Sequence, residues 1–440
     1  MSFGIFPIIT LLLGIGILLV GNGMLAVLIG LVAGQAFSET VTGIVMSGYF
    51  VGFVGGSFII PPLIRSVGYI RTFAGMAALA SVATVAYGAF QDPVIWWLLR
   101  VISGICLVGI YIVVESWLNE QVPSKFRGRI FAIYMMVNMI ALGLGMGSGP
   151  LFGNLDTFTP YVIASVLFTL GLVPVAFTPM PQPQSIPTPS PGFKHLYSAS
   201  PTGFIGAVFS GVLNGILWGL GPIFWLRLGL SEAESATFMA LVIGGGALLQ
   251  WPIGHLSDGH DRRKIIIAVC LAAAMAALLI STTATISRLA LAVCAFLYGG
   301  LMLTLYSVSV AHVNDRVEPG QILEAARTLL LLYGFGAMAG PAFSGPFMEY
   351  FGPSALPVIS AAALIVLAGV AFQQILTIPS AQPSEQLHFV PMTRTSQAAV
   401  EMLPEAAGVD IPVAAKSVIT SEVPLKNKPM GGNSGCMISH

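Results

Sequence analysis

The sequence predicts an all-α integral membrane protein, with twelve transmembrane helices arranged in two parallel-repeat six-helix bundles. Three observations support this fold class. Of the 440 residues, 56% are hydrophobic and only 8% are charged, against roughly 25% charged residues in soluble domains. Apolar runs long enough to cross a bilayer recur twelve times along the chain. Residues of the first six runs return in the last six at similar spacing.

The composition also excludes several classes of protein. A soluble enzyme of this length would need a far more polar surface than 8% charged residues supply. The 18 basic and 18 acidic residues balance, so the sequence has no basic excess that would bind nucleic acid. Its four cysteines show no CxxC spacing, and three lie in apolar runs, which indicates neither a disulfide framework nor a metal site.

Each apolar run holds about 20 or more residues, the length of a transmembrane helix. The first run lacks a charged N-terminal region and is longer than a signal peptide, so we predict that it is the first span. The twelve predicted spans are 6–33, 40–63, 71–91, 94–118, 130–153, 160–178, 203–225, 234–255, 265–284, 288–312, 326–346 and 353–377.

Polar segments divide the chain into four predicted parts. An N-terminal bundle (1–178) and a C-terminal bundle (203–377) are separated by a cytoplasmic linker (179–202). The linker begins PMPQPQSIPTPSPGFKH, and its proline and serine content predicts a segment without helix. Residues 378–440 contain no long apolar run and are predicted to form a disordered cytoplasmic tail.

The distribution of Lys and Arg predicts the orientation of the spans. If the N-terminus is cytoplasmic, the outer side holds only Arg227 and Arg288. The inner loops then hold Arg65, Arg71, Lys125, Arg127, Arg129, Lys194, Arg262, Arg263, Lys264, Arg316 and Arg327. Cytoplasmic loops are enriched in basic residues, so both termini are expected in the cytoplasm.

The two halves repeat at nearly constant offsets. Asn22 and Gly23 match Asn214 and Gly215 at an offset of 192, and Gly52 matches Gly244 at the same offset. Further matches are Gly104, Tyr111 and Asn119 with Gly299, Tyr306 and Asn314 at 195, and Gly145, Gly149 and Pro150 with Gly336, Gly340 and Pro341 at 191. Six spans separate the copies, so the bundles should be parallel and related by an axis along the membrane normal.

The segment GHLSDGHDRRK (254–264) resembles a G-x-L-x-D-x-x-G-R-R-K signature, with Asp261 where the pattern prefers Gly. Arg100 to Gly104 resembles an R-x-x-x-G element, and GMGSGPLFG (145–153) a G-x-x-x-G-P element. By these motifs the chain resembles the major facilitator superfamily over residues 1–377. The matching loop of the first half departs from the pattern, with Ser66 at the position of the Asp. The sequence is also similar to an uncharacterised bacterial branch of this family, which implies a multi-pass protein of the inner membrane.

Polar residues within the spans are candidates for a solute path, because a charge at the bilayer centre costs about 2.5–3.5 kcal/mol on insertion scales. Arg100 is the only Lys or Arg well inside a predicted span. Helical spacing places Gly104, Tyr111 and Glu115 on its face. The predicted path residues are Asn22, Arg100, Tyr111, Glu115, Asn214, Trp218, Tyr298 and Tyr306, with Asn138 and Gln250 as weaker candidates.

Each of these residues also has a structural alternative. Arg100 could extend to the outer interface, and Glu115 could anchor the inner one. Asn22 and Asn214 lie near mid-membrane, where an amide either meets substrate or bonds to a neighbouring helix. The tyrosines could serve in packing alone.

Two further groups of residues are predicted to take part in conformational change. Asp258 could accept hydrogen bonds from Arg262, Arg263 and Lys264 or cap a helix across the bundle, and the resemblance implies that this loop is a conformational latch. The alternative is that the basic residues only anchor the loop in the cytoplasm. Gly145, Gly149 and Pro150, with Gly340 and Pro341, should permit close packing and a helix bend at a moving interface. A nucleotide-binding loop is a poor alternative, because no strand precedes the glycines.

The sequence therefore predicts a secondary active transporter that moves a small solute by alternating access. The resemblance implies proton coupling, although no Asp or Glu lies in the central third of a span, and uniport stays open; Glu39, Glu115 and His312 are the titratable candidates. Arg100 indicates either an anionic, carboxylate-bearing solute or an internal ion pair. No cofactor is expected, and we expect a monomer in the lipid bilayer. The alternative function is a non-transporting membrane sensor or scaffold, and an enzyme is not expected.

Overall fold

The computed structural model describes residues 5–123, 126–148, 156–178, 192–318 and 321–377, together with Phe389 and Ser396. Twelve of the helices in these ranges are long and apolar enough to cross a membrane, which confirms the predicted number of spans. The predicted tail (378–440) and residues 179–191 of the predicted linker lie outside the described residues, apart from Phe389 and Ser396.

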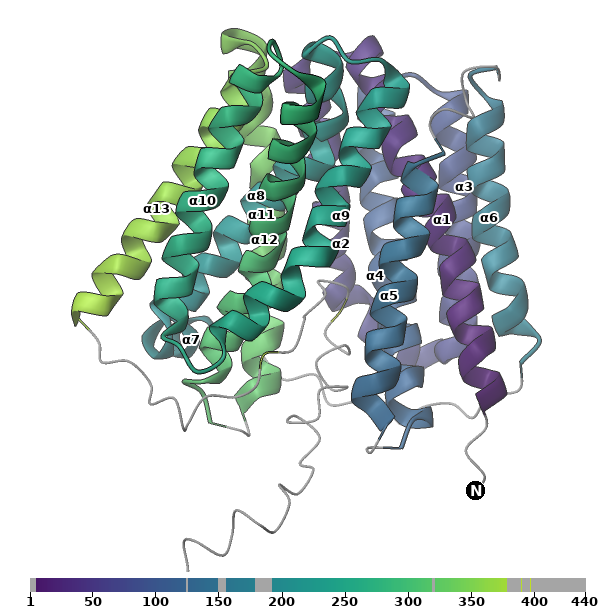
Figure 1. Ribbon diagram of the computed structural model, residues 1–440. Coiled ribbons are helices and arrows are strands. Elements are labelled where there is room, and N and C mark those ends of the chain that lie inside the picture. The colour runs from purple at the N-terminus through teal and green to yellow at the C-terminus, as the bar shows by residue number, and fades with distance from the viewer. Residues whose placement is uncertain are drawn as a thin grey trace, which may run out of the picture. The chain divides into compact units, whose positions relative to one another are not determined.

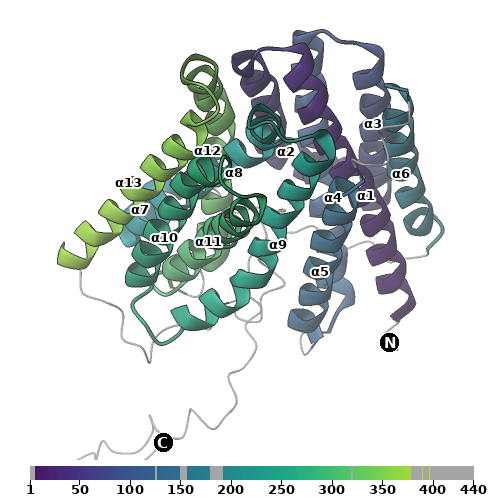
Figure 2. The same cartoon turned by 45° about the horizontal axis from the view of Figure 1, so that its top comes forward.

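The helices of the first and second halves of the chain form two groups that lie side by side (Figures 1 and 2). The first half consists of α1 (Ile5–Ala36), α2 (Glu39–Val67), α3 (Tyr69–Ala89), α4 (Pro93–Gln121), α5 (Arg127–Met146) and α6 (Thr159–Ala176). The second half consists of α8 (Pro201–Arg227), α9 (Glu232–Ser257), α10 (Arg262–Thr283), α11 (Arg288–Asn314), α12 (Ile322–Phe351) and α13 (Ala355–Thr377). We refer to the end at which α1 begins, at the bottom of Figure 1, as the lower end, and to the opposite end as the upper end.

Equivalent helices have equivalent neighbours in the two halves. Helix α1 packs on α5 and α6, and α8 packs on α12 and α13. Helix α2 packs on α4, and α9 packs on α11. This correspondence confirms the predicted duplication into two parallel six-helix bundles.

Close helix crossings in both halves occur at glycines, as expected where lipid supplies little force to drive helices together. A Cβ atom added at Gly52 would overlap the carbonyl oxygen of Val101, and one at Gly104 would overlap that of Tyr49. The corresponding crossing of α9 and α11 places Gly245 against Phe296 and Gly299 against Val242. The glycines thus set the distance between these helices.

These crossings correct two of the sequence matches. The contact made by Gly52 is repeated by Gly245, at an offset of 193, whereas Gly244 has open space around its Cα. Gly145 meets the carbonyl of Val20 on α1, and the equivalent contact on α8 belongs to Gly340 at an offset of 195. Gly145 is therefore the counterpart of Gly340 and not of Gly336, one helical turn away.

Polar caps define where several helices begin. Ser38 accepts a hydrogen bond from the Val41 N–H at the start of α2, and Asp92 caps α4 just before Pro93. Ser231 and Glu234 form a reciprocal capping box on α9. Such caps satisfy backbone N–H groups that have no partner within the helix.

Two local features differ from the sequence prediction. The end of the predicted linker contains a short helix, α7 (Phe193–Ala199), which packs against α8 and α12. The Gly192 N–H donates to the Thr328 hydroxyl at 3.1 Å, so α12 supports the start of this helix. Helix α5 ends at Met146, short of the predicted residue 153, and Gly147 follows it as the C-cap.

Candidate functional site

Arg100 is a buried cation on α4, with 7% of its surface exposed. Its guanidinium carbon lies 5.1 Å from the centre of the Tyr49 ring on α2, within cation–π range. A hydrogen bond also joins Arg100 to Tyr87. Its Nε has no hydrogen-bond partner, and no carboxylate of the described residues forms an ion pair with it. The described residues therefore show neither an internal ion pair nor an exposed side chain at this position.

A cavity of about 200 Å³ lies beside Arg100 between the two halves. Its lining comes from α1, α2, α4 and α5 of the first half and from α8, α9, α11 and α12 of the second. Among the described lining residues Arg100 is the only charged one. The aromatic lining residues are Tyr49, Phe50, Phe53, Tyr111, Trp218 and Tyr333.

Three amide side chains supply further polar groups to the cavity. The Asn138 Nδ2 donates to the Tyr134 carbonyl at 2.8 Å, while its buried Oδ1 has no partner. The Gln250 Nε2 donates to the Ser307 hydroxyl at 2.9 Å. Asn22 lines the cavity without a hydrogen bond to any other described residue. Unsatisfied amide groups beside a cavity are available to a polar solute.

The structure brings four of the eight predicted path residues together in this cavity, namely Asn22, Arg100, Tyr111 and Trp218. Both weaker candidates, Asn138 and Gln250, lie there as well. The other four, Glu115, Asn214, Tyr298 and Tyr306, are buried outside the lining.

These four residues contact their own surroundings. Glu115 accepts a hydrogen bond from Tyr134 at 2.9 Å and another from Ser396, so its carboxylate faces polar groups outside the cavity. The Asn214 Nδ2 donates to the Ser210 carbonyl of the same helix at 2.8 Å and to the Met302 sulfur on α11 at 3.6 Å, so the amide joins two helices. Tyr306 packs edge-on against Tyr333, with the ring centres 5.2 Å apart. Tyr298 lines a separate hollow of about 40 Å³ within the second half.

Polar contacts join the two halves at the upper end. The Arg227 Nε donates to Glu39 at 2.6 Å, which forms an ion pair between α8 and α2. The Gln35 Nε2 donates to Glu232 at 2.8 Å. The backbone N–H of Thr40 donates to Glu349 at 3.0 Å. Each of these contacts links one half to the other at the upper end.

The predicted helix-bend residues lie partly at this interface. Pro341, within α12, packs its ring on Gly219, and its carbonyl would meet a Cβ added at Gly43 of the other half. Gly340 packs on α8, and Gly145 packs on α1. Gly149 and Pro150 lie outside the described residues.

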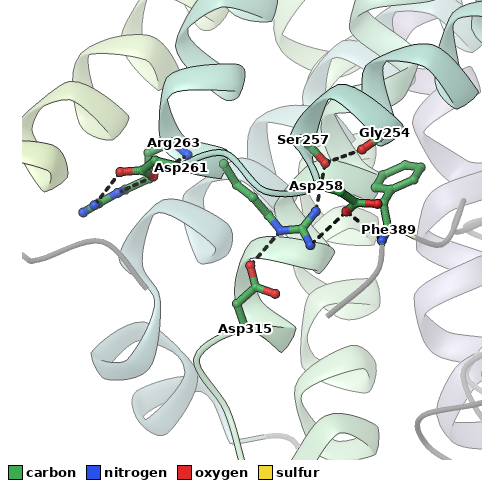
Figure 3. Close-up of polar contacts among 8 residues, drawn as sticks. Gly254, Ser257, Asp258, Asp261, Arg263, Asp315 and Phe389 are labelled. Carbon is green, nitrogen blue, oxygen red and sulfur yellow. Dashed lines mark hydrogen bonds and ion pairs between the residues drawn. The ribbon is translucent and has the colours of Figure 1, made fainter. Parts of the chain in front are cut away.

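Among the predicted latch residues, Asp258 follows α9, and Arg262, Arg263 and Lys264 form the first turn of α10; Figure 3 labels Asp258 and Arg263. Arg262 is buried and donates to Asp315 at 2.7 Å and to the Ser257 hydroxyl at 2.8 Å, with Asp258 3.4 Å away. Arg263 pairs with Asp261 at 2.8 Å. These contacts lie within the second half, so they do not show the predicted contact across the bundle. Lys264 is exposed.

Asp261 is also the cap of α10, accepting a hydrogen bond from the Arg263 N–H at 3.0 Å. Partial burial by itself would raise the pKa of its carboxyl, but the hydrogen bonds and positive charge of Arg263 outweigh that effect and lower the pKa below its usual value. The carboxylate is therefore ionised and fixes the beginning of the helix.

Two residues beyond α13 contact both halves at the lower end. The Phe389 N–H donates to Asp258 at 2.9 Å, and its ring lies against Gly254, where an added Cβ would overlap it (Figure 3). Ser396 bonds to Glu115 in the first half. The sequence gives no signal for these contacts, since both residues lie in a segment without an apolar run.

A family model described as Major Facilitator Superfamily matches residues 11–321, with a second match over residues 203–396. The chain belongs to the major facilitator superfamily.

Similar proteins of this superfamily occur among curated bacterial relatives. The uncharacterised MFS-type transporter YcaD of Salmonella typhi is 29% identical over 382 residues, which cover 86% of this chain and 96% of the relative. The Escherichia coli protein of the same name is 28% identical over 376 residues, covering 84% of this chain and 95% of the relative. The resemblance predicted from the sequence, to an uncharacterised bacterial branch of the superfamily, is thus confirmed.

Solved structures of superfamily transporters share the fold. A bacterial homologue of the human lysosomal transporter Spinster, in an inward-facing and unoccupied conformation, has a TM-score of 0.68 at 16% identity, covering 88% of this chain and 99% of that one. The nucleoside transporter NupG has a TM-score of 0.67 at 14% identity, covering 86% and 100%. These likenesses confirm the all-helical twelve-span fold class.

In this superfamily member, several cavity residues were not predicted from the sequence. Tyr49, Phe50 and Phe53 lie on α2, and Tyr333 lies on α12. An aromatic residue in an apolar span gives the same sequence signal whether it faces lipid, a neighbouring helix or a cavity. The close crossing at Gly52 and Gly104 could have identified α2 as the helix facing Arg100.

Proposed function

We propose that this protein is a secondary transporter that moves a small solute by alternating access through the cavity between its two halves. The observation that supports it most is that helices of both halves line the cavity while cross-half contacts close one end. In such an arrangement, rocking of one half against the other would transfer access from the lower end to the upper end.

The proposed orientation has the lower end in the cytoplasm of a bacterial cell. Basic residues favour this orientation, because Arg262, Arg263 and Lys264 lie at the lower end while Arg227 and Arg288 lie at the upper end. In this orientation the described conformation is closed to the outside.

Glu39 is the titratable residue best placed to couple protons to the movement. Its carboxylate accepts from Arg227 of the other half at 2.6 Å. Loss of this ion pair would weaken the closure of the upper end. Glu115, the sequence candidate at the inner end, bonds to Tyr134 and Ser396 outside the cavity.

The first experiment measures access to the cavity from each side. Ala26 lines the cavity, so a single cysteine at that position (Ala26→Cys), in a background without native cysteines, reports access of a small impermeant thiol reagent. Right-side-out and everted vesicles are labelled separately. We expect Arg227→Ala to raise labelling from the outside and lower it from the inside, because one upper-end contact is lost.

Arg288→Ala is the matched control. Arg288 is also an exposed arginine at the upper end, but its partner Glu234, at 3.7 Å, lies in the same half. This variant should leave both labelling rates unchanged. Labelling from one side alone in every variant would refute alternating access, and a simultaneous rise from both sides would indicate a pore.

Deletion of residues 378–440 separates the transporter from the sensor or scaffold alternative. A transporter retains alternate labelling after the deletion, because the cavity and the upper-end contacts lie within residues 5–377. Loss of labelling from either side in the shortened but folded chain would favour the alternative.

A further inference from the structure

We infer that the cavity takes monoanionic solutes that carry one carboxylate on an apolar body. This inference rests on the proposed function, because it assigns the substrate class to the same cavity.

The charge argument begins with Arg100. Its side chain is more than nine-tenths buried and lines the cavity, yet no described carboxylate pairs with it and its Nε has no partner. A buried cation without a counter-charge is unfavourable, so a ligand that supplies one negative charge is favoured there. A guanidinium presents parallel N–H donors, which match the two oxygens of a carboxylate.

The same arrangement disfavours other charge states. A cationic solute would meet Arg100 without an acidic lining residue to neutralise it, because none of the described lining residues is Asp or Glu. A dianion would carry a second negative charge, and the described lining offers no second cation to neutralise it. One buried arginine therefore selects one negative charge.

The walls favour an apolar body of limited size. Phe50, Phe53 and Trp218 present aromatic surface, and Leu142 and Ile243 add aliphatic surface. A volume of about 200 Å³ lies below the roughly 300–1,000 Å³ of sites for drug-sized ligands. The side-chain amide of Asn22 can donate a hydrogen bond that would orient the carboxylate of such a solute.

The test compares ligands that differ only in charge. Purified protein is heated with benzoate, phenylacetate or octanoate, and with the corresponding amides and benzylamine. A ligand that binds the folded state raises its thermal midpoint. We expect at least one carboxylate to raise the midpoint, and its amide and benzylamine to leave it unchanged.

Arg100→Gln should weaken carboxylate binding roughly 10- to 150-fold, the range expected for loss of hydrogen bonds to a charged group. Arg100→Lys, which keeps the charge, should retain part of the affinity. Arg327→Gln is the matched control, because Arg327 is equally buried and lies 5.8 Å from the Phe58 ring but does not line the cavity. This control variant should bind carboxylates like the wild type.

The outcomes separate the two proposals. If the amides or benzylamine bind as well as the carboxylates, if no carboxylate binds, or if Arg100→Gln binds normally, the substrate class is wrong. Alternate labelling of Ala26→Cys would then still support the transporter. Carboxylate binding through Arg100 together with one-sided labelling would instead confirm the site and reject the transport cycle.

Discussion

Arg262 lies between two carboxylates at unequal distances, 2.7 Å from Asp315 and 3.4 Å from Asp258. The resemblance implies a latch around Asp258, but the guanidinium of Arg262 lies closest to the buried Asp315, a residue without a role in the sequence prediction. Asn22 and Arg100 could be placed in the cavity because polar residues stand out in apolar spans, and Tyr111 and Trp218 because helical spacing puts them on the faces of Arg100 and Asn214. The positions of Tyr49 and Tyr333 could not be predicted, because they depend on which helices touch.

At the residue scale we predict unequal effects for the two acidic partners of Arg262. Asp315→Asn should lower the free energy of unfolding by about 3–5 kcal/mol, since it leaves a buried arginine without its nearest counter-charge. Asp258→Asn should cost no more than about 1 kcal/mol, because Asp258 is 23% exposed and lies 3.4 Å away. Denaturation of both variants in the same detergent measures the difference. Equal losses would contradict the assignment of Asp315 as the main partner.

Asp258→Asn also tests the predicted latch. The latch stays a prediction, because the contacts of this loop lie within the second half. If the loop biases the conformation, this variant should shift labelling of Ala26→Cys between the two sides while keeping the fold. Unchanged labelling would argue that the loop serves only to anchor the second half.

At the scale of elements, the helices were predictable and their crossings were only partly so. Twelve apolar runs predicted twelve spans, because a span needs a fixed length of apolar sequence. Helix α7 and the early end of α5 depend on local caps and on contact with other helices, which run length does not reveal. The repeat could be recognised in the sequence. Glycines are so frequent, however, that sequence matching paired Gly145 with Gly336, one helical turn away from its structural counterpart Gly340.

The crossing of α2 and α4 gives a paired prediction. Gly52→Ala should lower the free energy of unfolding by about 1–3 kcal/mol, because the new methyl group would overlap the Val101 carbonyl and force the helices apart. Gly55→Ala, on the same helix with open space around its Cα, should be neutral or stabilising by up to about 1 kcal/mol. Thermal midpoints of both variants in one detergent test this, and similar midpoints would show that α2 and α4 do not depend on close contact.

At the scale of the whole molecule, the contacts of the upper end predict that a covalent link there traps one conformation. A short bifunctional reagent joining Gln35→Cys to Glu232→Cys should abolish outside labelling of the cavity and preserve inside labelling, because these residues belong to different halves. In this experiment, access to the cavity is measured by adding a carboxylate to one side of the vesicle at a time and testing whether it protects the cavity from labelling.

The control cross-link joins Arg288→Cys to Glu234→Cys, which lie in the same half. It should leave access from both sides intact, since the two halves remain free to move. Persistent outside access in the first cross-linked protein would mean that the halves do not part at the upper end.

Arg100 also has an electrical consequence. An empty cavity carries its positive charge with no counter-ion among the described residues, whereas a bound monoanion makes the same cavity neutral. In the proposed transport cycle, exchanging the open side of the empty protein would shift charge through the membrane field, where one elementary charge corresponds to about 2.3 kcal/mol per 100 mV. The membrane potential should therefore change the rate at which the empty carrier returns, and it should have little effect on the rate of the loaded step.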